Sequence, residues 1–277
     1  GVGASRTMRI AQKLYEGVNI GSETTGLITY MRTDGVQLSS QAIEELREEI
    51  INRHGKDYIP QIPRVYKSKA ANAQEAHEAI RPTSISRDPE DMSQYLDTEQ
   101  LKLYELIWKR TISSQMQSAE LDETSADISN KDMSIVFRAN GSQVSFPGFF
   151  IYRDREDDKI LPKLLENDKV DLQKADGEQH FTQPPPRYTD ASLIKKMEEL
   201  GIGRPSTYAS ILQVLVNRSY VEKEKGKHLP QERGRILTAF LNNFFGQYIE
   251  YDFTADLEKK LDKVSDGKLN YKKLLKE

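Results

Sequence analysis

Three consecutive prolines at positions 184–186 constrain the fold of this chain more than any other feature. Proline lacks a backbone N–H and fixes φ near about −65°, so the run fits neither a helix interior nor a central strand. Before it, from about residue 119, short β-type runs alternate with Gly, Asn and Asp turns; elsewhere the patterns are helical. The sequence therefore predicts a helical domain over 1–117, a small antiparallel β domain over 118–184 and a second helical domain over 185–277.

Apolar residues recur at helical spacing in three stretches of the first domain. We expect helices over 7–16, from Ser39 or Ser40 as N-cap to near Gly55, and from Thr98 over 99–115. The residues expected to face inward are Ile10, Ala11, Leu14, Ile43, Leu46, Ile50, Leu101, Tyr104, Leu106, Ile107 and Trp108. In the β domain the expected strands include 134–139, 144–146, 149–152 and 170–173.

The last domain predicts two short helices followed by a hairpin. Thr189 or Asp190 caps the first helix and Gly201 ends it, and the second begins at Pro205 or Ser206. Strands at 220–222 and 227–230 complete a winged-helix arrangement. A last helix begins near residue 254, and we expect its stripe of Leu257, Leu261 and Val264 to pack inward.

Composition excludes several classes of protein. The 277 residues are 37% hydrophobic and 30% charged, which is typical of a globular protein and not of a disordered one. No cysteine is present, so disulfides and thiolate zinc sites are excluded. No apolar run is long enough to span a membrane and no signal-peptide layout occurs, so we expect a cytoplasmic protein.

Charge is unevenly distributed although the net charge is only −3. Between residues 187 and 235 there are ten Lys or Arg and six Asp or Glu. This locally basic segment is where we expect contact with a phosphate backbone.

One apolar run, residues 26–34 (Gly-Leu-Ile-Thr-Tyr-Met-Arg-Thr-Asp), brings Tyr30 two residues before Arg32. In an extended segment, side chains two apart project from the same face, so both can address one phosphate. A tyrosine hydroxyl is a nucleophile only once deprotonated, and with a reference pKa of about 10 roughly one in a thousand is ionised at neutral pH. An arginine stabilises negative charge on phosphate oxygens. A Tyr-x-Arg pair alone, however, is common in ordinary surface strands.

The whole run resembles the active-site tyrosine motif of bacterial type IA DNA topoisomerases. Further matches to that family follow in order at residues 74–82 (Gln-Glu-Ala-His-Glu-Ala-Ile-Arg-Pro), 201–209 (Gly-Ile-Gly-Arg-Pro-Ser-Thr-Tyr-Ala) and 251–255 (Tyr-Asp-Phe-Thr-Ala). The resemblance runs from about residue 7 to the end. It implies a multidomain α and β fold, with mainly helical, winged-helix-like lobes joined by a small antiparallel β domain.

The resemblance also implies roles for individual residues. Tyr30, Arg32 and His77 are the expected catalytic residues, with His77 positioning phosphate or handling protons. For DNA binding, the family pattern points to Arg204, Ser206, Thr207, Gln12 and Glu16. Without the resemblance, a lone histidine is more often structural, and Ser206 is equally well explained as a helix cap.

The activity that the resemblance implies is transient cleavage of one DNA strand through a 5′-phosphotyrosine link, passage of a second strand, and religation. This cycle relaxes negatively supercoiled DNA without ATP, with single-stranded segments of DNA as partner and a monomer as the working form. The family's Mg²⁺ binds an N-terminal domain whose acidic motif is not found here. We therefore expect no metal site in this chain and no activity from the chain alone.

Two other interpretations stay open from the residues. A non-catalytic winged-helix DNA-binding module explains residues 187–235 and leaves the Tyr30 run without a role. A purely structural fragment predicts no affinity for DNA at low salt.

Overall fold

The structure is a computed structural model that describes residues 2–33, 35–66, 78–155 and 157–276. By internal packing the chain divides into two units, and each is built from separate stretches of sequence. Unit 1 comprises Gly1–Ala42, Val65–Trp108 and Pro185–Glu277, and unit 2 comprises Ile43–Arg64 and Lys109–Pro184. One boundary between the units, after Pro184, falls inside the run of three prolines. The three domains expected from the sequence, 1–117, 118–184 and 185–277, stay a prediction.

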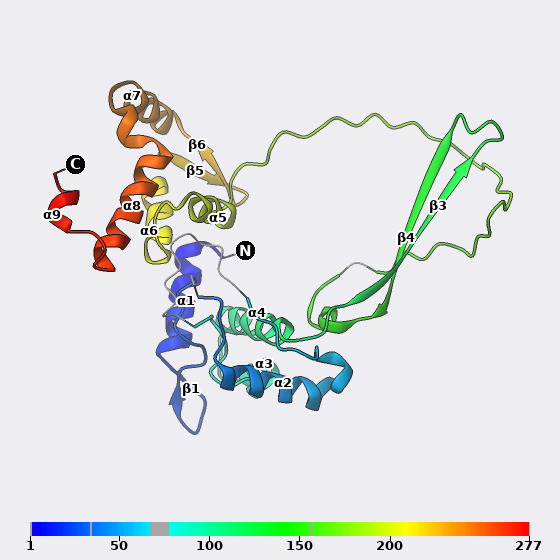
Figure 1. Ribbon diagram of the computed structural model, residues 1–277, viewed down its shortest axis with the longest axis horizontal. Coiled ribbons are helices and arrows are strands. Elements are labelled where there is room, and N and C mark those ends of the chain that lie inside the picture. Colours follow the sequence, from blue (N-terminus) through cyan, green and yellow to red (C-terminus); the bar gives the residue numbers. More distant parts are fainter. Residues whose placement is uncertain (1, 34, 67–77, 156, 277) are drawn as a thin grey trace. The chain divides into compact units, whose positions relative to one another are not determined.

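The first two stretches of unit 1 contain helices and one short hairpin (Figure 1). Their elements are α1 (Ala4–Glu16), β1 (Val18–Asn19), β2 (Thr24–Thr25), the start of α2 (Ser40–His54), α3 (Pro89–Met92) and most of α4 (Thr98–Ser114). Helix α1 buries Ile10, Ala11 and Leu14, as its spacing predicts. The hairpin of β1 and β2 was not predicted.

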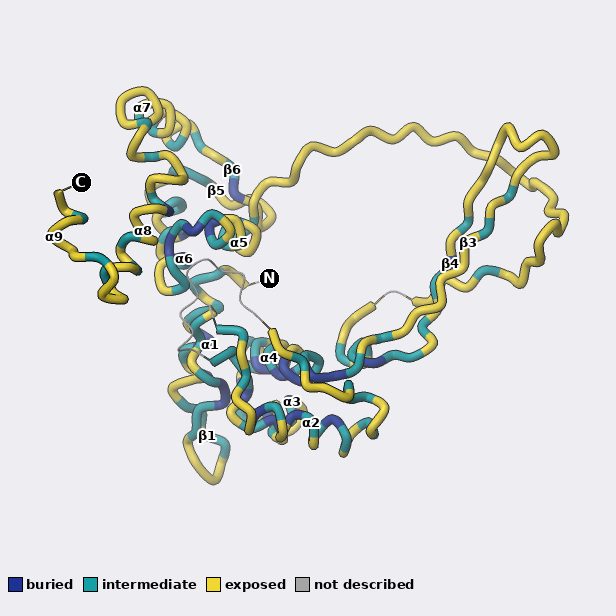
Figure 2. Tube along the Cα trace, viewed as in Figure 1, coloured by how far each residue is buried: buried dark blue, intermediate teal, exposed yellow. Residues whose placement is uncertain are grey.

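Helix α4 supplies the largest buried side chains of this part of unit 1. Figure 2 shows buried residues along this helix. Tyr104 and Trp108 are buried, and their polar atoms are satisfied by backbone carbonyls: the Tyr104 hydroxyl donates to Arg87 O at 2.7 Å and Trp108 Nε1 donates to Ile85 O at 2.8 Å. Burial raises the pKa of Tyr104 well above its ordinary value. The prediction that Leu106 faces inward is wrong, because it lies on the opposite face of the helix and is 65% exposed.

The last stretch of unit 1 has the predicted winged-helix arrangement. Its elements are α5 (Asp190–Leu200), α6 (Pro205–Asn217), β5 (Val221–Glu224), β6 (Lys227–Pro230), α7 (Glu232–Ile249), α8 (Tyr251–Ser265) and α9 (Tyr271–Leu274). Thr189 and Ser192 form a reciprocal capping box on α5, and Gly201 ends that helix with a φ of 70°. Strands β5 and β6 pair antiparallel from Val221 with Pro230 to Glu224 with Lys227. The inward stripe predicted for the last helix is wrong in part: Leu257 and Leu261 of α8 are exposed.

Unit 2 contains the rest of α2, η1 (Lys56–Tyr58), the end of α4, β3 (Glu120–Ser129), β4 (Val136–Phe146) and η2 (Gly148–Tyr152). Ser39 Oγ accepts from Ala42 N at 3.2 Å, so the predicted cap of α2 is present. Strands β3 and β4 form an antiparallel hairpin, with Ser129 opposite Val136 near its tip. The core of the unit is formed by Leu46, Ile50, Ile112, Met116 and the fully buried Gln115.

Two strands predicted in this region are wrong. Residues 149–152 form η2 instead, because Phe149 N donates to Gln117 O and Tyr152 places its hydroxyl 2.7 Å from His54 Nε2. Residues 170–173 are exposed and irregular (Figure 2), since β3 and β4 pair with each other and, in the described part of unit 2, no further strand flanks them. Side chains with high β propensity form no strand when a pairing partner is missing.

Candidate active site

Tyr30 lies at the surface of unit 1, two residues after a pair of buried residues. Leu27 and Ile28 are almost completely buried, whereas Tyr30 is 47% exposed. The described part of the run, residues 26–33, is not the regular strand that its composition predicts, because only Ile28 there forms a β-bridge, to Pro82. Its backbone donors go to two different neighbours: Leu27 N donates to Leu14 O of α1 at 2.7 Å, and Thr29 N donates to Arg81 O at 2.9 Å. The same-face arrangement of Tyr30 and Arg32 therefore stays a prediction.

Side-chain hydrogen bonds from both segments hold the run against residues 79–83. Thr29 Oγ1 donates to Ala79 O at 2.8 Å and accepts from Arg81 N at 2.9 Å. Thr83 Oγ1 donates to Gly26 O at 2.7 Å. These bonds join positions fifty or more residues apart. Together with the bond from Leu27 N to Leu14 O of α1, they fix the backbone that leads to Tyr30.

Helix α1 approaches the run closely at Gly26. A Cβ atom at this position would lie 2.5 Å from Tyr15 O, closer than any side chain tolerates. The Tyr15 ring meets the Tyr30 ring edge-on, with centroids 5.3 Å apart. Sequence reasoning missed Tyr15; the glycine at the start of the run was the available signal of a close backbone approach.

Gln12 and Glu16, predicted from the resemblance, lie one turn apart on α1. Gln12 Nε2 donates to Glu16 Oε1. Both therefore lie on the helix whose carboxyl end binds the Tyr30 run.

The motif at residues 74–82 is described only from Glu78 onward, so His77 lies outside the described residues, as does Asp34 of the first motif. Arg81 forms an ion pair with Glu78, with Nε to Oε1 at 2.7 Å, and donates to Pro82 O. Although burial opposes it, hydrogen bonds from Arg81 and Ser39 hold the pKa of Glu78 below its ordinary value. Arg81 is thus engaged in an ion pair and a backbone hydrogen bond, which is a structural role.

The residues predicted at 204–207 lie at the start of α6. Ser206 and Thr207 are exposed, and Thr207 Oγ1 accepts from Arg204 N at 3.0 Å. The Arg204 guanidinium is 19% exposed and faces two carboxylates of α8, Glu258 and Asp262, each at 2.9 Å. It also donates to Gly203 O at 3.0 Å. Any phosphate that binds Arg204 must compete with these carboxylates.

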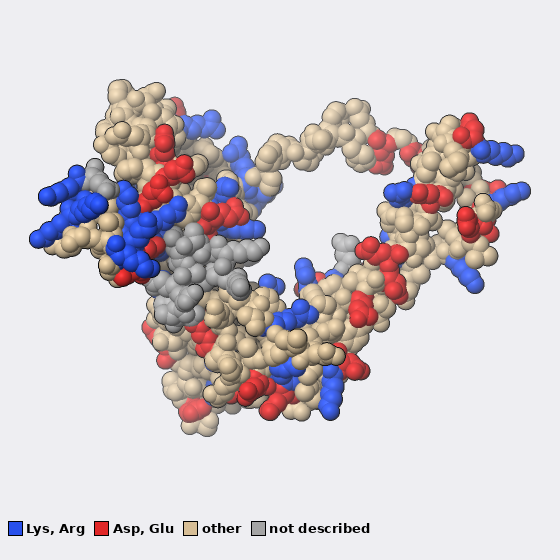
Figure 3. Space-filling view, in the orientation of Figure 1, with Lys and Arg blue, Asp and Glu red and all other residues tan. Residues whose placement is uncertain are grey.

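Positive charge gathers further along the same stretch. Lysines of α8, of α9 and of the turn between them gather near the C-terminal end (Figure 3); they are Lys259, Lys260, Lys263, Lys268, Lys272 and Lys273. Within the described ranges, no three His, Asp or Glu side chains are placed to hold a metal ion. Nor does any helix in the described part of the chain have the length and apolarity needed to cross a membrane.

Comparisons with known proteins agree over the entire chain. A family model described as DNA topoisomerase matches residues 1–276. The DNA topoisomerase 1 of Rickettsia bellii is 54% identical over 282 residues, covering 99% of this chain and 35% of that protein, and that of Zymomonas mobilis is 49% identical over 287 residues, covering 99% and 23%. Full-length topoisomerase I from Thermotoga maritima superposes with a TM-score of 0.83 at 37% identity, covering all of this chain and 45% of that one. The chain thus spans about a third of the length of its relatives from Rickettsia bellii and Rickettsia felis.

Proposed function

The chain belongs to the bacterial DNA topoisomerase family, of type IA, and on this premise we propose that it carries the nucleophile of the reaction and part of the DNA-binding surface. The reaction is transient cleavage of one DNA strand, passage of another strand and religation. Since the chain spans only part of its relatives, this activity is assigned to a complete protein, meaning the chain joined to the segments that the relatives carry outside the match.

The observation that supports this proposal best is the setting of Tyr30. Its side chain is exposed to an incoming strand, while the backbone beneath it is bound to α1 through Leu14 and to residues 79–83 through Thr29. An exposed nucleophile on a fixed backbone loses little conformational freedom when it reacts, which is the advantage of a preorganised site.

The chemistry assigned to the chain is a transesterification. Tyr30 Oη forms a bond to a DNA phosphorus, the bond from that phosphorus to the 3′-oxygen breaks, and the tyrosine proton is released as the 3′-oxygen gains one. Religation is the reverse, so the phosphodiester bond energy is conserved and ATP is not required. Arg32 provides a permanent positive charge for the phosphate oxygens, and His77 is the proposed partner for phosphate or proton handling.

Among the described residues, no three His, Asp or Glu side chains are placed to hold a metal ion. We propose that the Mg²⁺ implied by the resemblance binds in the complete protein to segments that the relatives carry outside the match.

For the DNA partner we propose single-stranded segments bound along the phosphate backbone at the start of α6. Ser206 and Thr207 are exposed at the N-terminus of α6, where the helix dipole favours a phosphate, and Arg204 adds charge once it leaves Glu258 and Asp262. Gln12 and Glu16 are proposed to line the same path nearer to Tyr30. A monomer in the cytoplasm is the form in which we expect the protein to act.

The non-catalytic winged-helix module is not favoured. The family match covers residues 1–276 and therefore includes the Tyr30 run. A bare DNA-binding module gives that run no role.

The test is a covalent adduct. End-labelled single-stranded DNA incubated with the complete protein and separated on a denaturing gel is expected to yield a protein-linked product, and Tyr30→Phe is expected to abolish it. Tyr15→Phe is the matched control, because it removes a hydroxyl from the neighbouring ring. An adduct that persists in Tyr30→Phe would show that another residue is the nucleophile.

A further inference from the structure

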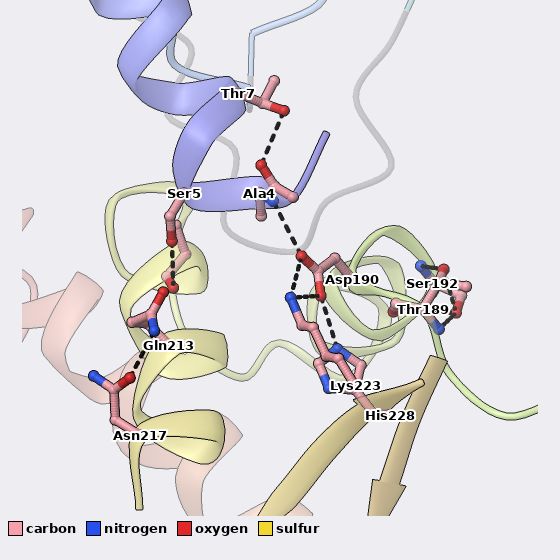
Figure 4. A network of polar contacts seen from close by, with 12 residues as sticks. Ala4, Ser5, Thr7, Thr189, Asp190, Ser192, Gln213, Asn217, Lys223 and His228 are labelled. Carbon is pink, nitrogen blue, oxygen red and sulfur yellow. Dashed lines mark hydrogen bonds and ion pairs between the residues drawn. The ribbon is translucent and has the colours of Figure 1, made fainter. Parts of the chain in front are cut away.

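Asp190, the first residue of α5, joins three elements of unit 1 through one carboxylate (Figure 4). Its Oδ2 accepts from Ala4 N at 3.0 Å, in the first turn of α1. Its Oδ1 accepts from His228 Nε2 of β6 at 2.8 Å and pairs with Lys223 Nζ of β5 at 2.7 Å. The carboxylate therefore links the winged helix to the N-terminal end of α1.

Capping does not explain this use of the carboxylate. The start of α5 is already capped by Thr189 and Ser192, which exchange side-chain and backbone hydrogen bonds. Asp190 is a favourable charge at a helix N-terminus, but that effect needs none of the three contacts that its oxygens make. The side chain is only 17% exposed, so its oxygens depend on these partners in place of water.

His228 makes the contact specific. Its side chain is buried, and Nε2 is directed at Asp190 while Nδ1 has no hydrogen-bond partner among the described atoms. A buried ring with one satisfied nitrogen fixes the direction from which Asp190 is approached.

Helix α1 connects this carboxylate to the Tyr30 run. At its N-terminal end Ala4 donates to Asp190, and Ser5 Oγ donates to Ala209 O of α6 at 3.4 Å. At its C-terminal end Leu14 O accepts from Leu27 N, and the Tyr15 ring contacts Tyr30. A helix of 13 residues is about 20 Å of stiff backbone, so its position at one end determines its position at the other.

We propose that Asp190 is a positioning residue for Tyr30: it fixes α1 to the winged helix, and α1 in turn sets the place of the nucleophile. This inference rests on the proposed function of Tyr30. The proposal gives the winged helix a second role besides binding DNA. A shift of α5 and of the β5–β6 hairpin is transmitted through α1 to Tyr30.

The test combines two variants that weaken the link at Asp190 on its two sides. Asp190→Asn removes the charge that Lys223 and His228 bind, and Ala4→Pro removes the N–H that α1 donates to Asp190. Proline is tolerated at Ala4 because it is the first residue of α1 and Gly3 before it is extended (φ −68°, ψ 156°). Asp171→Asn, an exposed carboxylate of unit 2, is the control for lost charge.

In the complete protein we expect both variants to slow adduct formation at saturating single-stranded DNA by at least tenfold. The Kd for that DNA is expected to change by less than twofold. Asp190→Glu, which keeps the carboxylate, is expected to retain part of the rate that Asp190→Asn loses. In this chain alone, hydrogen exchange of the Leu27 amide is expected to accelerate at least tenfold in both variants. A rate within twofold of wild type in both, or a loss of affinity with an unchanged rate, would overturn the proposal.

The exchange measurement separates this inference from the proposed function. If the wild-type protein forms no adduct, the assignment of Tyr30 fails, and the Leu27 amide still decides whether Asp190 controls the run. If Asp190→Asn does not fold, Ala4→Pro alone decides, and an unchanged Leu27 exchange rate in it refutes the coupling.

Discussion

Neutralising the two carboxylates that hold Arg204 is expected to strengthen DNA binding and weaken the fold at the same time. In the double variant Glu258→Gln, Asp262→Asn, the guanidinium loses both ion pairs, each 2.9 Å long. The side chains of Arg204, Glu258 and Asp262 are 19%, 24% and 40% exposed, so solvent screens the pairs in part. Exposed pairs contribute up to about 1 kcal/mol each, which gives about 2 kcal/mol for the two.

That free energy opposes any phosphate that competes for Arg204. Removing it is expected to lower the Kd for single-stranded DNA by roughly thirtyfold, because about 1.4 kcal/mol corresponds to a factor of ten. One further phosphate contact also steepens the dependence of log K on log salt by about 0.7 for a single strand. The free energy of unfolding is expected to fall by about 2 kcal/mol.

The assay is a fluorescence-anisotropy titration of labelled single-stranded DNA at several salt concentrations, together with denaturant unfolding. The control is Asp256→Asn, Asp266→Asn, which removes equal charge in or next to α8 without touching Arg204, since these residues pair with Lys259 and Lys268. If both double variants change the Kd and the salt slope equally, competition for Arg204 is refuted and only net charge matters.

Four further outcomes are expected. Arg32→Lys in the complete protein keeps the positive charge but loses the two-point contact with phosphate, which costs about 1.5–3 kcal/mol. Single-turnover cleavage should therefore slow by roughly ten- to a hundredfold. A cleavage rate within twofold of wild type would show that Arg32 has only a structural role. Thr29→Val should lower the free energy of unfolding by about 1–2 kcal/mol in denaturant titrations, since two hydrogen bonds are lost, whereas the exposed Thr182→Val should not. Burial tends to raise the pKa of Asp190, yet the bonds from Lys223, Ala4 and His228 hold that pKa below its ordinary value of 3.8. The ionised carboxylate therefore stabilises the fold fully above pH 3.8, and this stabilisation is lost as the pH falls through the lower folded pKa. In Asp190→Asn, the free energy of unfolding should therefore depend less steeply on pH in the acid range. The chain alone should leave negatively supercoiled plasmid unrelaxed in the presence of Mg²⁺, and a ladder of topoisomers that is absent in Tyr30→Phe would contradict this.

Local chemistry made much of the fold predictable. The cap at Ser39, the capping residue Thr189 and the left-handed Gly201 follow from rules that involve only a few neighbouring residues, and the structure has all three. The helices and the hairpin of the winged-helix arrangement follow for the same reason. Helix α4 begins at Thr98, as expected, and Asp97 Oδ1 accepts from Glu99 N and Gln100 N in its first turn.

The wrong or missing secondary-structure predictions concern segments whose conformation depends on contacts with residues far away in the sequence. Helix α7 was not predicted; Phe240 and Phe244 remain exposed, and the backbone leaves helical geometry at Phe245. The strand expected at 170–173 needs a neighbour, and η2 replaces another strand because its backbone bonds to residue 117.

The residues of the candidate site also differ in whether the sequence alone could point to them. Tyr30 and Arg32 could be predicted as site residues because they lie in one continuous motif, and their roles stay a prediction. Tyr15, Thr29 and Asp190 were missed because their roles come from contacts across the sequence, and the bond from Ala4 to Asp190 spans 186 positions. Periodicity and motif spacing carry no information about contacts of that range.

The discontinuity of unit 1 has a consequence for folding. The whole of unit 2 is inserted between its parts, so the bond from Ala4 to Asp190 forms only after a loop of 186 residues closes. Loop-closure entropy grows with the logarithm of length, so deleting forty residues from the 109–184 stretch would change that cost by only about 0.2 kcal/mol. Unit 1 should therefore tolerate large changes in the length of the hairpin region at equilibrium, whereas its folding rate is limited by how long the two distant ends take to meet.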